Sequence, residues 1–253
     1  MSSSPPEQHG ADELNAGAQR KPSPLIDILI SIVLPSLILM KASGDDRLGP
    51  TGALLVALAF PVLYGLHDLL RYRSRNLMAV LGIVSVLLTG GIGLLEIDAR
   101  WLAVKEAAIP LIIGIGVIVA NRLGYPLVRK LLFNPSLMNV ERINDELEAR
   151  DNKVEFEHRL DRANYLLAGT FLFSSIMNYL LARLIVKSDS GTQAFNEELG
   201  RMTLLSYPVI AIPSMVMMLC IFWFIWKTIS RLTGLGLEEA LNNPDDKAEK
   251  RDA

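Results

Sequence analysis

The chain has very few of the residues with which soluble enzymes build active sites. Among its 253 residues there is one cysteine, and there are only three histidines, at positions 9, 67 and 158. One cysteine excludes an intrachain disulfide, and the scattered histidines lack metal-ligand spacing. No HExxH, Walker, paired-cysteine or Ser-His-Asp arrangement occurs in the sequence. We therefore expect a protein that is not an enzyme and that uses no cofactor or metal.

An excess of charge of one sign is missing as well. The formal net charge is −2, from 25 Lys and Arg against 27 Asp and Glu. Nucleic-acid-binding proteins usually present a basic surface, so this balance argues against a nucleic-acid partner. What the chain does have is apolar residues, which make up 51% of the sequence. They form long unbroken runs rather than periodic patterns, which indicates a membrane protein.

Six apolar blocks approach or exceed the length of about 20 residues that a helix needs to cross a bilayer. They lie at about 25–40, 48–69, 76–95, 101–120, 163–186 and 202–229. None has the two-residue alternation of a membrane β-strand. The predicted fold class is all-α: a polytopic membrane protein with a bundle of six transmembrane helices spanning residues 25–230.

The segments outside these blocks are polar. Residues 1–24 are predicted to be a disordered tail, and residues 231–253 a charged tail. Loop 121–162, between spans four and five, contains apolar residues at intervals of three, three and four: Leu137, Val140, Ile143 and Leu147. This spacing predicts an amphipathic helix within residues 136–162. The helix either docks a partner or packs under its own bundle.

The distribution of Lys and Arg predicts the orientation. Most of them lie in the two tails, in the short turn 70–75 and in loop 121–162, which share one side of a six-span protein. Cytoplasmic loops carry an excess of basic residues, so both termini and the amphipathic helix are predicted to be cytoplasmic.

The connection between spans three and four holds the main candidate site. The candidate polar cluster consists of Glu96, Asp98, Arg100, Lys105 and Glu106, with Arg183 from span five. In one interpretation, Lys105 and Glu106 line an outward-facing polar pocket, because charges within a span normally face the bundle interior. In the other, Glu96 pairs with Arg100, Asp98 caps span four and Lys105 extends toward the interface. Charges at helix ends are common, which favours the second interpretation.

A second candidate is a proton-linked pair, His67 and Asp68, at the cytoplasmic end of span two. Polar residues at this position more often anchor a helix at the interface. Prolines lie inside several spans, as in many transporters, at positions 35, 61, 110, 208 and 213. The glycines of TGGIG (89–93) are not followed by GK[ST], so we expect close helix packing there rather than a phosphate loop.

One stretch resembles a known family. TGGIGLLEIDARWLAVKEAAIP, continuing into YPLVRKLLF, is similar to the bacterial intracellular septation protein A family, and more closely to a septation-protein-like branch with longer chains. The similarity rests on the glycine-rich helix end, Asp98, Trp101, Lys105 and the sequence PLVRK from Pro126. Glu106 and the long fourth loop depart from the family pattern. The resemblance implies an inner-membrane protein of envelope maintenance or division, with no catalytic residues and no cofactor.

Two functional hypotheses follow. The first is a non-enzymatic inner-membrane protein of the cell envelope, whose partners are the lipid bilayer and, through loop 136–162, other membrane or division proteins. The second is a small-solute or proton-coupled transporter that uses Lys105 and Glu106. Small residues on spans three and four fit packing within one chain or between copies of a homo-oligomer equally.

Overall fold

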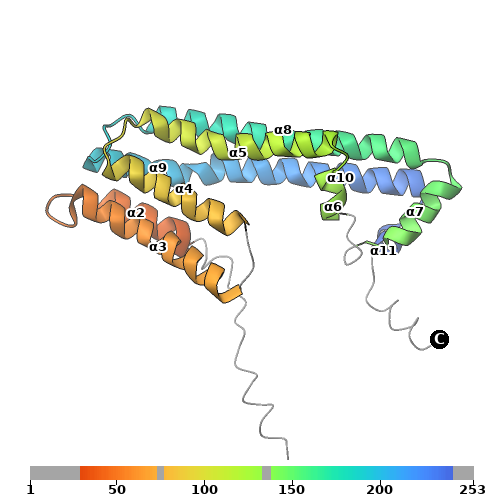
Figure 1. Ribbon diagram of the computed structural model, residues 1–253, viewed down its shortest axis with the longest axis horizontal. Coiled ribbons are helices and arrows are strands. Elements are labelled where there is room, and N and C mark those ends of the chain that lie inside the picture. Colours follow the sequence, from red (N-terminus) through yellow and green to blue (C-terminus); the bar gives the residue numbers. More distant parts are fainter. Residues whose placement is uncertain (1–28, 73–76, 133–137, 242–253) are drawn as a thin grey trace, which may run out of the picture.

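The computed structural model describes residues 29–72, 77–132 and 138–241. Long helices run back and forth along one axis (Figure 1). They are η1 with α2 (Leu29–Val33, Leu34–Lys41), α3 (Gly49–Tyr72), α4 (Leu77–Leu94), α5 (Arg100–Arg122), α8 (Lys153–Ile185), and α9, η2 and α10 in succession (Gln193–Ser206, Tyr207–Ala211, Ile212–Thr233). In these residues the only β-type pairing is an isolated bridge between Met138 and Leu241. The all-helical class is therefore confirmed for the described part.

Four helical segments are long and apolar enough to cross a membrane: Gly49–Leu66, Arg100–Arg122, Lys153–Ile185 and Gln193–Thr233. They correspond to predicted spans two, four, five and six. Helix α4 has 18 residues, and the side chains of its part Gly82–Leu94, which is apolar, are described. The helices η1 and α2 have only five and eight residues. Spans one and three are therefore not confirmed, and residues 25–28 and 76 lie outside the described part.

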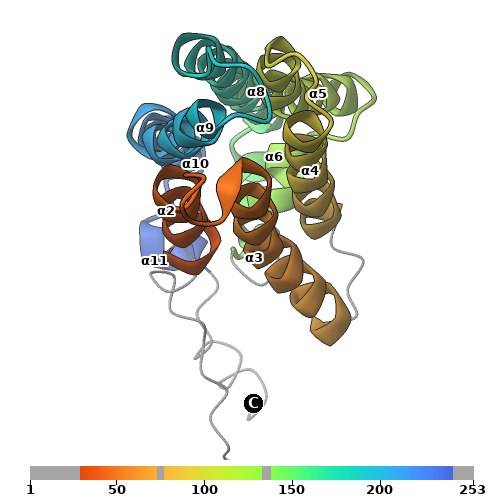
Figure 2. The same ribbon diagram turned by 90° about the vertical axis from the view of Figure 1, so that its left-hand side faces the viewer.

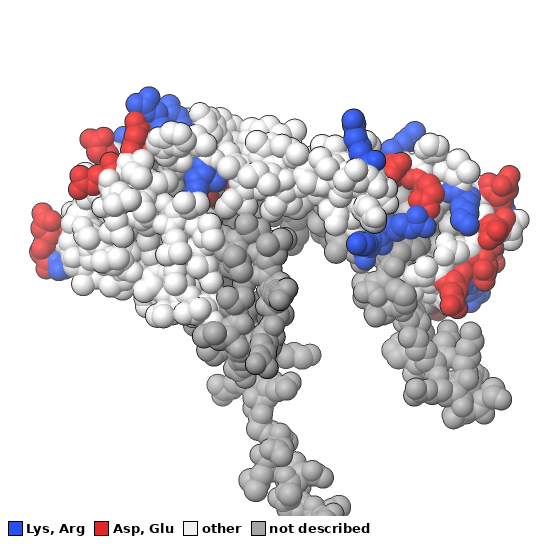
Figure 3. All heavy atoms as spheres, in the orientation of Figure 1, with Lys and Arg blue, Asp and Glu red and all other residues white. Residues whose placement is uncertain are grey.

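The charged side chains lie mainly at the two ends of the molecule, as expected for a protein that crosses a bilayer. Figure 3 shows Lys, Arg, Asp and Glu gathered mainly at the two ends of the molecule, with a largely uncharged zone between. The α2–α3, α4–α5 and α8–α9 connections share one end, and the short helices α6 (Leu127–Leu132), α7 (Val140–Ala149) and α11 (Leu237–Ala240) lie toward the other (Figure 1). Such a distribution suits a hydrocarbon layer bounded by two polar regions.

The helices form two groups. In the first, α5 and α10 both pack along α8, and its core includes Val117, Leu160 and Ile229. In the second, α2 packs on α3 and α3 on α4, with α9 lying against α2. Figure 2 shows the α3–α4 hairpin leaning away from the other helices at its far end. The second core, around Leu54 and Phe195, joins the two groups near the α2–α3 turn.

Prolines account for the irregular turns of these helices. Pro208 lies inside η2, Pro213 is the second residue of α10 after η2, and Pro35 is the second residue of α2 after η1. A proline has no N–H to donate to the carbonyl four residues earlier, so the hydrogen-bond pattern widens into a π-helical turn. Pro61 and Pro110 lie inside α3 and α5, which continue through them.

The predicted amphipathic helix corresponds to α7, which is shorter than the segment 136–162. Ile143 and Leu147 are buried in the core formed with α8 and α10. Asn139 caps the helix, its side chain accepting the N–H of Arg142 at 3.2 Å. The apolar face of α7 is thus covered by its own bundle, so within the described residues it offers no free docking face.

Two boundaries differ from the prediction. The last span was predicted from residue 202, but α9 begins at Gln193, where Thr192 accepts the N–H of Phe195 at 3.1 Å. Residues 231–241, predicted as part of a charged tail, close the core instead, and Leu232, Leu235 and Ala240 are buried. In both cases a few apolar residues pack inward from a segment that is polar on average. The tail 1–24 and residues 242–253 lie outside the described part.

Candidate functional site

The side chains of Lys105 and Glu106 turn into the bundle. Both lie on α5, which begins at Arg100, so a rise of about 1.5 Å per residue places them roughly 8–9 Å along the helix. That depth is about a quarter to a third of the hydrocarbon thickness of a bilayer, which is about 30 Å. Only 9% of the Lys105 side chain and 23% of the Glu106 side chain are exposed. The pair is therefore a charged group inside the bundle.

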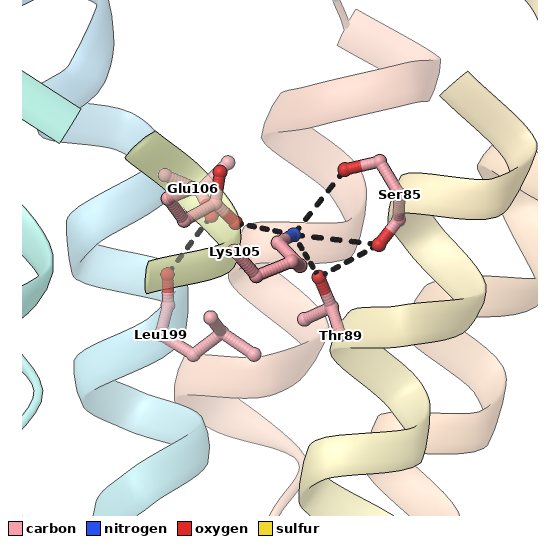
Figure 4. Close-up of polar contacts among 6 residues, drawn as sticks. Ser85, Thr89, Lys105, Glu106 and Leu199 are labelled. Atoms are coloured by element: carbon pink, nitrogen blue, oxygen red, sulfur yellow. Dashed lines mark hydrogen bonds and ion pairs between the residues drawn. The ribbon is translucent and has the colours of Figure 1, made fainter. Parts of the chain in front are cut away.

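Lys105 links α5 to α4. Its Nζ donates to Thr89 Oγ1 at 2.6 Å and lies 3.2 Å from Ser85 Oγ and 3.3 Å from Ser85 O (Figure 4). The same atom forms an ion pair with Glu106 Oε1 at 2.6 Å. Ser85 and Thr89 are four residues apart and share one face of α4. The ammonium thus has an acceptor for each of its three N–H bonds.

A cavity of about 200 Å³ adjoins this pair. It is lined by residues of η1, α2, α3, α4, α5 and α9, and Ser85, Thr89, Lys105 and Glu106 form its polar wall on the side of α4 and α5. The rest of the wall is largely apolar and includes Leu39, Leu58 and Met202. The cavity therefore lies at the junction of the two helix groups, where α4 meets α5.

Ser36 and Thr203 also line the cavity, and Ser36 is the one whose hydroxyl is unpaired among the described residues. Ser36 belongs to α2 and is 1% exposed. A buried hydroxyl without a partner is energetically unfavourable, by about 1–3 kcal/mol. Such groups are uncommon in native structures and call for an explanation such as an unseen ligand or water.

The remaining members of the predicted cluster lie elsewhere. Arg100 pairs with Asp98 at 2.8 Å rather than with Glu96, so the predicted Glu96–Arg100 pair is wrong. Asp98 accepts the N–H of Arg100 at 2.8 Å, but the N-cap position itself is Ala99, because α5 begins one residue later than predicted for a cap at Asp98. The hydrogen bond from Arg100 lowers the pKa of the Asp98 carboxyl below its usual value. Arg100 lies two positions after Asp98 and four positions after Glu96, and it pairs with the carboxylate that is nearer in sequence.

Arg183 joins this outer group and not the buried pair. It lines a cleft of about 440 Å³ together with Asp98, Arg100 and residues 186–189. Glu96 lies in the α4–α5 turn with φ of 51° and approaches Gly191. The extension of Lys105 toward the interface, expected in the second interpretation, is also wrong, since Lys105 bonds to α4. The predicted cluster is therefore two sites: an exposed turn and a buried pair.

The predicted pair of His67 and Asp68 belongs to α3, but its side chains lie outside the described part of the structure. Ser36, Ser85 and Thr89 were not among the predicted site residues. Hydroxyl residues are common in membrane helices, so each alone carries little information. The four-residue spacing of Ser85 and Thr89 was the only sequence signal for them.

Neither a protein-family model nor a curated protein nor a solved structure matches the chain. Functional argument therefore starts from the geometry of the site.

Proposed function

We propose that the chain is a non-enzymatic integral membrane protein that binds a small solute in the cavity beside Lys105 and Glu106 and carries it across the membrane. The observation that supports this proposal most is the direction of the pair, which turns into a cavity in the bundle. Ionisable groups at membrane depth are costly, and those that face a bundle interior mark substrate or ion pathways. Two prolines line the cavity, Pro35 next to the π-helical turn η1 and Pro61 inside α3. Prolines within membrane helices are a recurrent feature of transporters.

The test is a ligand panel on the purified full-length chain in detergent. Hexylamine, hexanoate, norleucine and hexanol present a cation, an anion, a zwitterion and a neutral group on similar apolar bodies. We expect one class to raise the unfolding temperature, because a ligand that binds only the folded state stabilises it. The rise should be absent in Glu106→Gln, and uptake of the binding compound into proteoliposomes should fall likewise.

The matched control is Glu155→Gln. Glu155 is a carboxylate paired with Arg159 at 2.6 Å, but it lies on the exposed part of α8, away from the cavity. This variant should keep the ligand response. If no compound of the panel shifts the unfolding temperature of the wild-type chain, or if Glu106→Gln responds as the wild type does, the solute-binding proposal is wrong.

A role in envelope maintenance is the second candidate, with both termini cytoplasmic in a bacterial inner membrane. Its support is that two residues of the septation-protein-like stretch, Thr89 and Lys105, contact each other across α4 and α5 at 2.6 Å. The residues of the resemblance thus belong to one structural unit. Deleting the gene should then give a division or envelope defect that Lys105→Met fails to complement at normal protein level. Complementation by Lys105→Met would contradict this role for the contact.

A further inference from the structure

The hydrogen-bonding capacity that is left around the cavity indicates the charge of its ligand. Lys105 Nζ lies within hydrogen-bonding distance of groups on Ser85 and Thr89 and of Glu106. An ammonium has three N–H bonds and no more, so these partners use its full donor capacity. An anionic ligand would have to displace some of them before it could bind Lys105.

Glu106, unlike Lys105, has unused hydrogen-bonding capacity. Its Oε1 receives Lys105, and among the described residues the carboxylate has no other partner. An ionised carboxylate has two oxygens and about four acceptor sites, so most of its capacity is unused. Its side chain is 23% exposed although it lines the cavity, so it is accessible to a ligand there. The unused charged capacity of the site is therefore negative.

Neutral acceptors add to this excess. The hydroxyl of Ser36, 1% exposed and unpaired among the described residues, offers an oxygen to the cavity. Pro61 has no N–H, so the carbonyl of Ala57, another lining residue, lacks its usual helical donor. Pro110 does the same to the carbonyl of Glu106. A ligand that brings several N–H donors would satisfy the Ser36 hydroxyl and the unused acceptor sites of Glu106.

The size and remaining walls restrict the rest of the ligand. About 200 Å³ corresponds to the volume of roughly six or seven water molecules. The apolar wall, from residues such as Leu39, Leu58 and Met202, favours a hydrocarbon body over a polar one. We infer that the cavity takes a small primary amine in its ammonium form, with the ammonium at Glu106 and Ser36 and a short alkyl tail against the apolar wall. This inference rests on the solute-binding function proposed above and names its substrate class.

The test measures affinities of the full-length chain in detergent by calorimetry. Hexylamine should bind, and hexanoate and hexanol should bind at least about tenfold more weakly, the loss expected for one charge-assisted hydrogen bond. Glu106→Gln should weaken hexylamine by a similar factor. Ser36→Ala should weaken it by less, and the control Glu155→Gln should leave it unchanged.

A wild-type measurement keeps the inference testable if the variants fold poorly. Hexyltrimethylammonium has the same charge and tail but no N–H donor, so it should bind at least about tenfold more weakly than hexylamine. Equal affinity of the two cations would overturn the donor argument. Preferential binding of hexanoate or norleucine would overturn the ammonium inference and leave the solute-binding function standing. Absence of binding by every compound of the panel would remove both.

Discussion

At the residue scale, the ion pair between Lys105 and Glu106 explains why two costly charges are tolerated inside the bundle. The two groups lie 2.6 Å apart and are mostly shielded from solvent. Breaking a buried pair by removing one partner typically costs about 3–5 kcal/mol, because the other charge is left without compensation. Replacing both charges removes that penalty. The effects of replacing Lys105 and Glu106 on the free energy of unfolding should therefore not be additive.

We therefore expect Lys105→Met to lower the free energy of unfolding by about 3 kcal/mol, the lower end of that range, because Glu106 is 23% exposed and then lacks its counter-charge. The double variant Lys105→Met with Glu106→Gln should be more stable than Lys105→Met alone. Denaturant titrations in mixed micelles measure the free energy of unfolding of the wild type, Lys105→Met, Glu106→Gln and the double variant, which together form a double-mutant cycle. The i,i+4 pair of Glu155 and Arg159, in which the glutamate is 51% exposed, is the control and should couple by only about 0.3–0.5 kcal/mol. Additive effects at Lys105 and Glu106 would contradict the ion pair.

The sequence located this pair but did not determine its direction. A Lys near a helix end can extend to the interface or turn inward, and both conformations satisfy its charge. The outcome depends on acceptors on another helix, Ser85 and Thr89, and on the space that α2 and α9 leave. Such long-range packing is not visible in local patterns. A local ion pair in the exposed turn at Asp98 was predictable from sequence, because the partner Arg100 lies only two positions away.

At the element scale, α2 and α9 approach each other through a glycine. A Cβ added to Gly200 would lie 2.7 Å from the backbone carbonyl of Ser36 and 3.3 Å from Leu39 Cβ. A backbone atom cannot move aside as a flexible side chain can, so the helices would have to separate. Ser36 and Leu39 both line the cavity. The width of the cavity thus depends on this contact.

Gly200→Ala should destabilise the chain by about 1–3 kcal/mol, the usual cost of overpacking. It should also weaken any ligand response of the cavity. Gly116→Ala is the matched control, because that helical glycine has no neighbour within 4 Å of an added Cβ. It should be neutral or stabilising by up to about 1 kcal/mol, since alanine favours a helix. Equal unfolding temperatures for the two variants would show that α2 and α9 do not pack this closely.

Helix α9 also shows where hydropathy stops being informative. Its first part contains Glu197, Glu198 and Arg201, so residues 193–201 were left outside the predicted span, which began at residue 202. Phe195 and Leu199 nevertheless lie on one face and are buried in the second core. The four-residue spacing of these two apolar residues is a weak signal, and the three charged residues lower the mean hydropathy of any window that includes them. In contrast, α5 and α10 were recognised from sequence, because each contains a long stretch without charge, residues 107–121 in α5 and 212–226 in α10.

At the scale of the whole molecule, α8 is longer than the hydrocarbon core of a membrane is thick, so part of it must lie outside the core. Its 33 residues span about 50 Å, whereas a hydrocarbon core is about 30 Å thick. The first three turns, residues 153–162, are charged and the following residues are apolar. The N-terminal part of α8 should therefore project into water on the side of α7 and α11. From the excess of basic residues in the sequence on that side, we predict that this part of α8 faces the cytoplasm.

Cysteine labelling in intact cells tests this placement, starting from Cys220→Ser, which removes the one natural cysteine. A membrane-impermeant maleimide should label Ser188→Cys in the α8–α9 turn without lysis, and His158→Cys only after lysis. Ile112→Cys should stay unlabelled in both conditions, because Ile112 is exposed at 67% in the middle of α5, where only lipid would cover it. Labelling of His158→Cys without lysis would reverse the orientation. Labelling of Ile112→Cys would mean that water reaches the exposed face of α5, and the membrane placement of that helix would then be wrong.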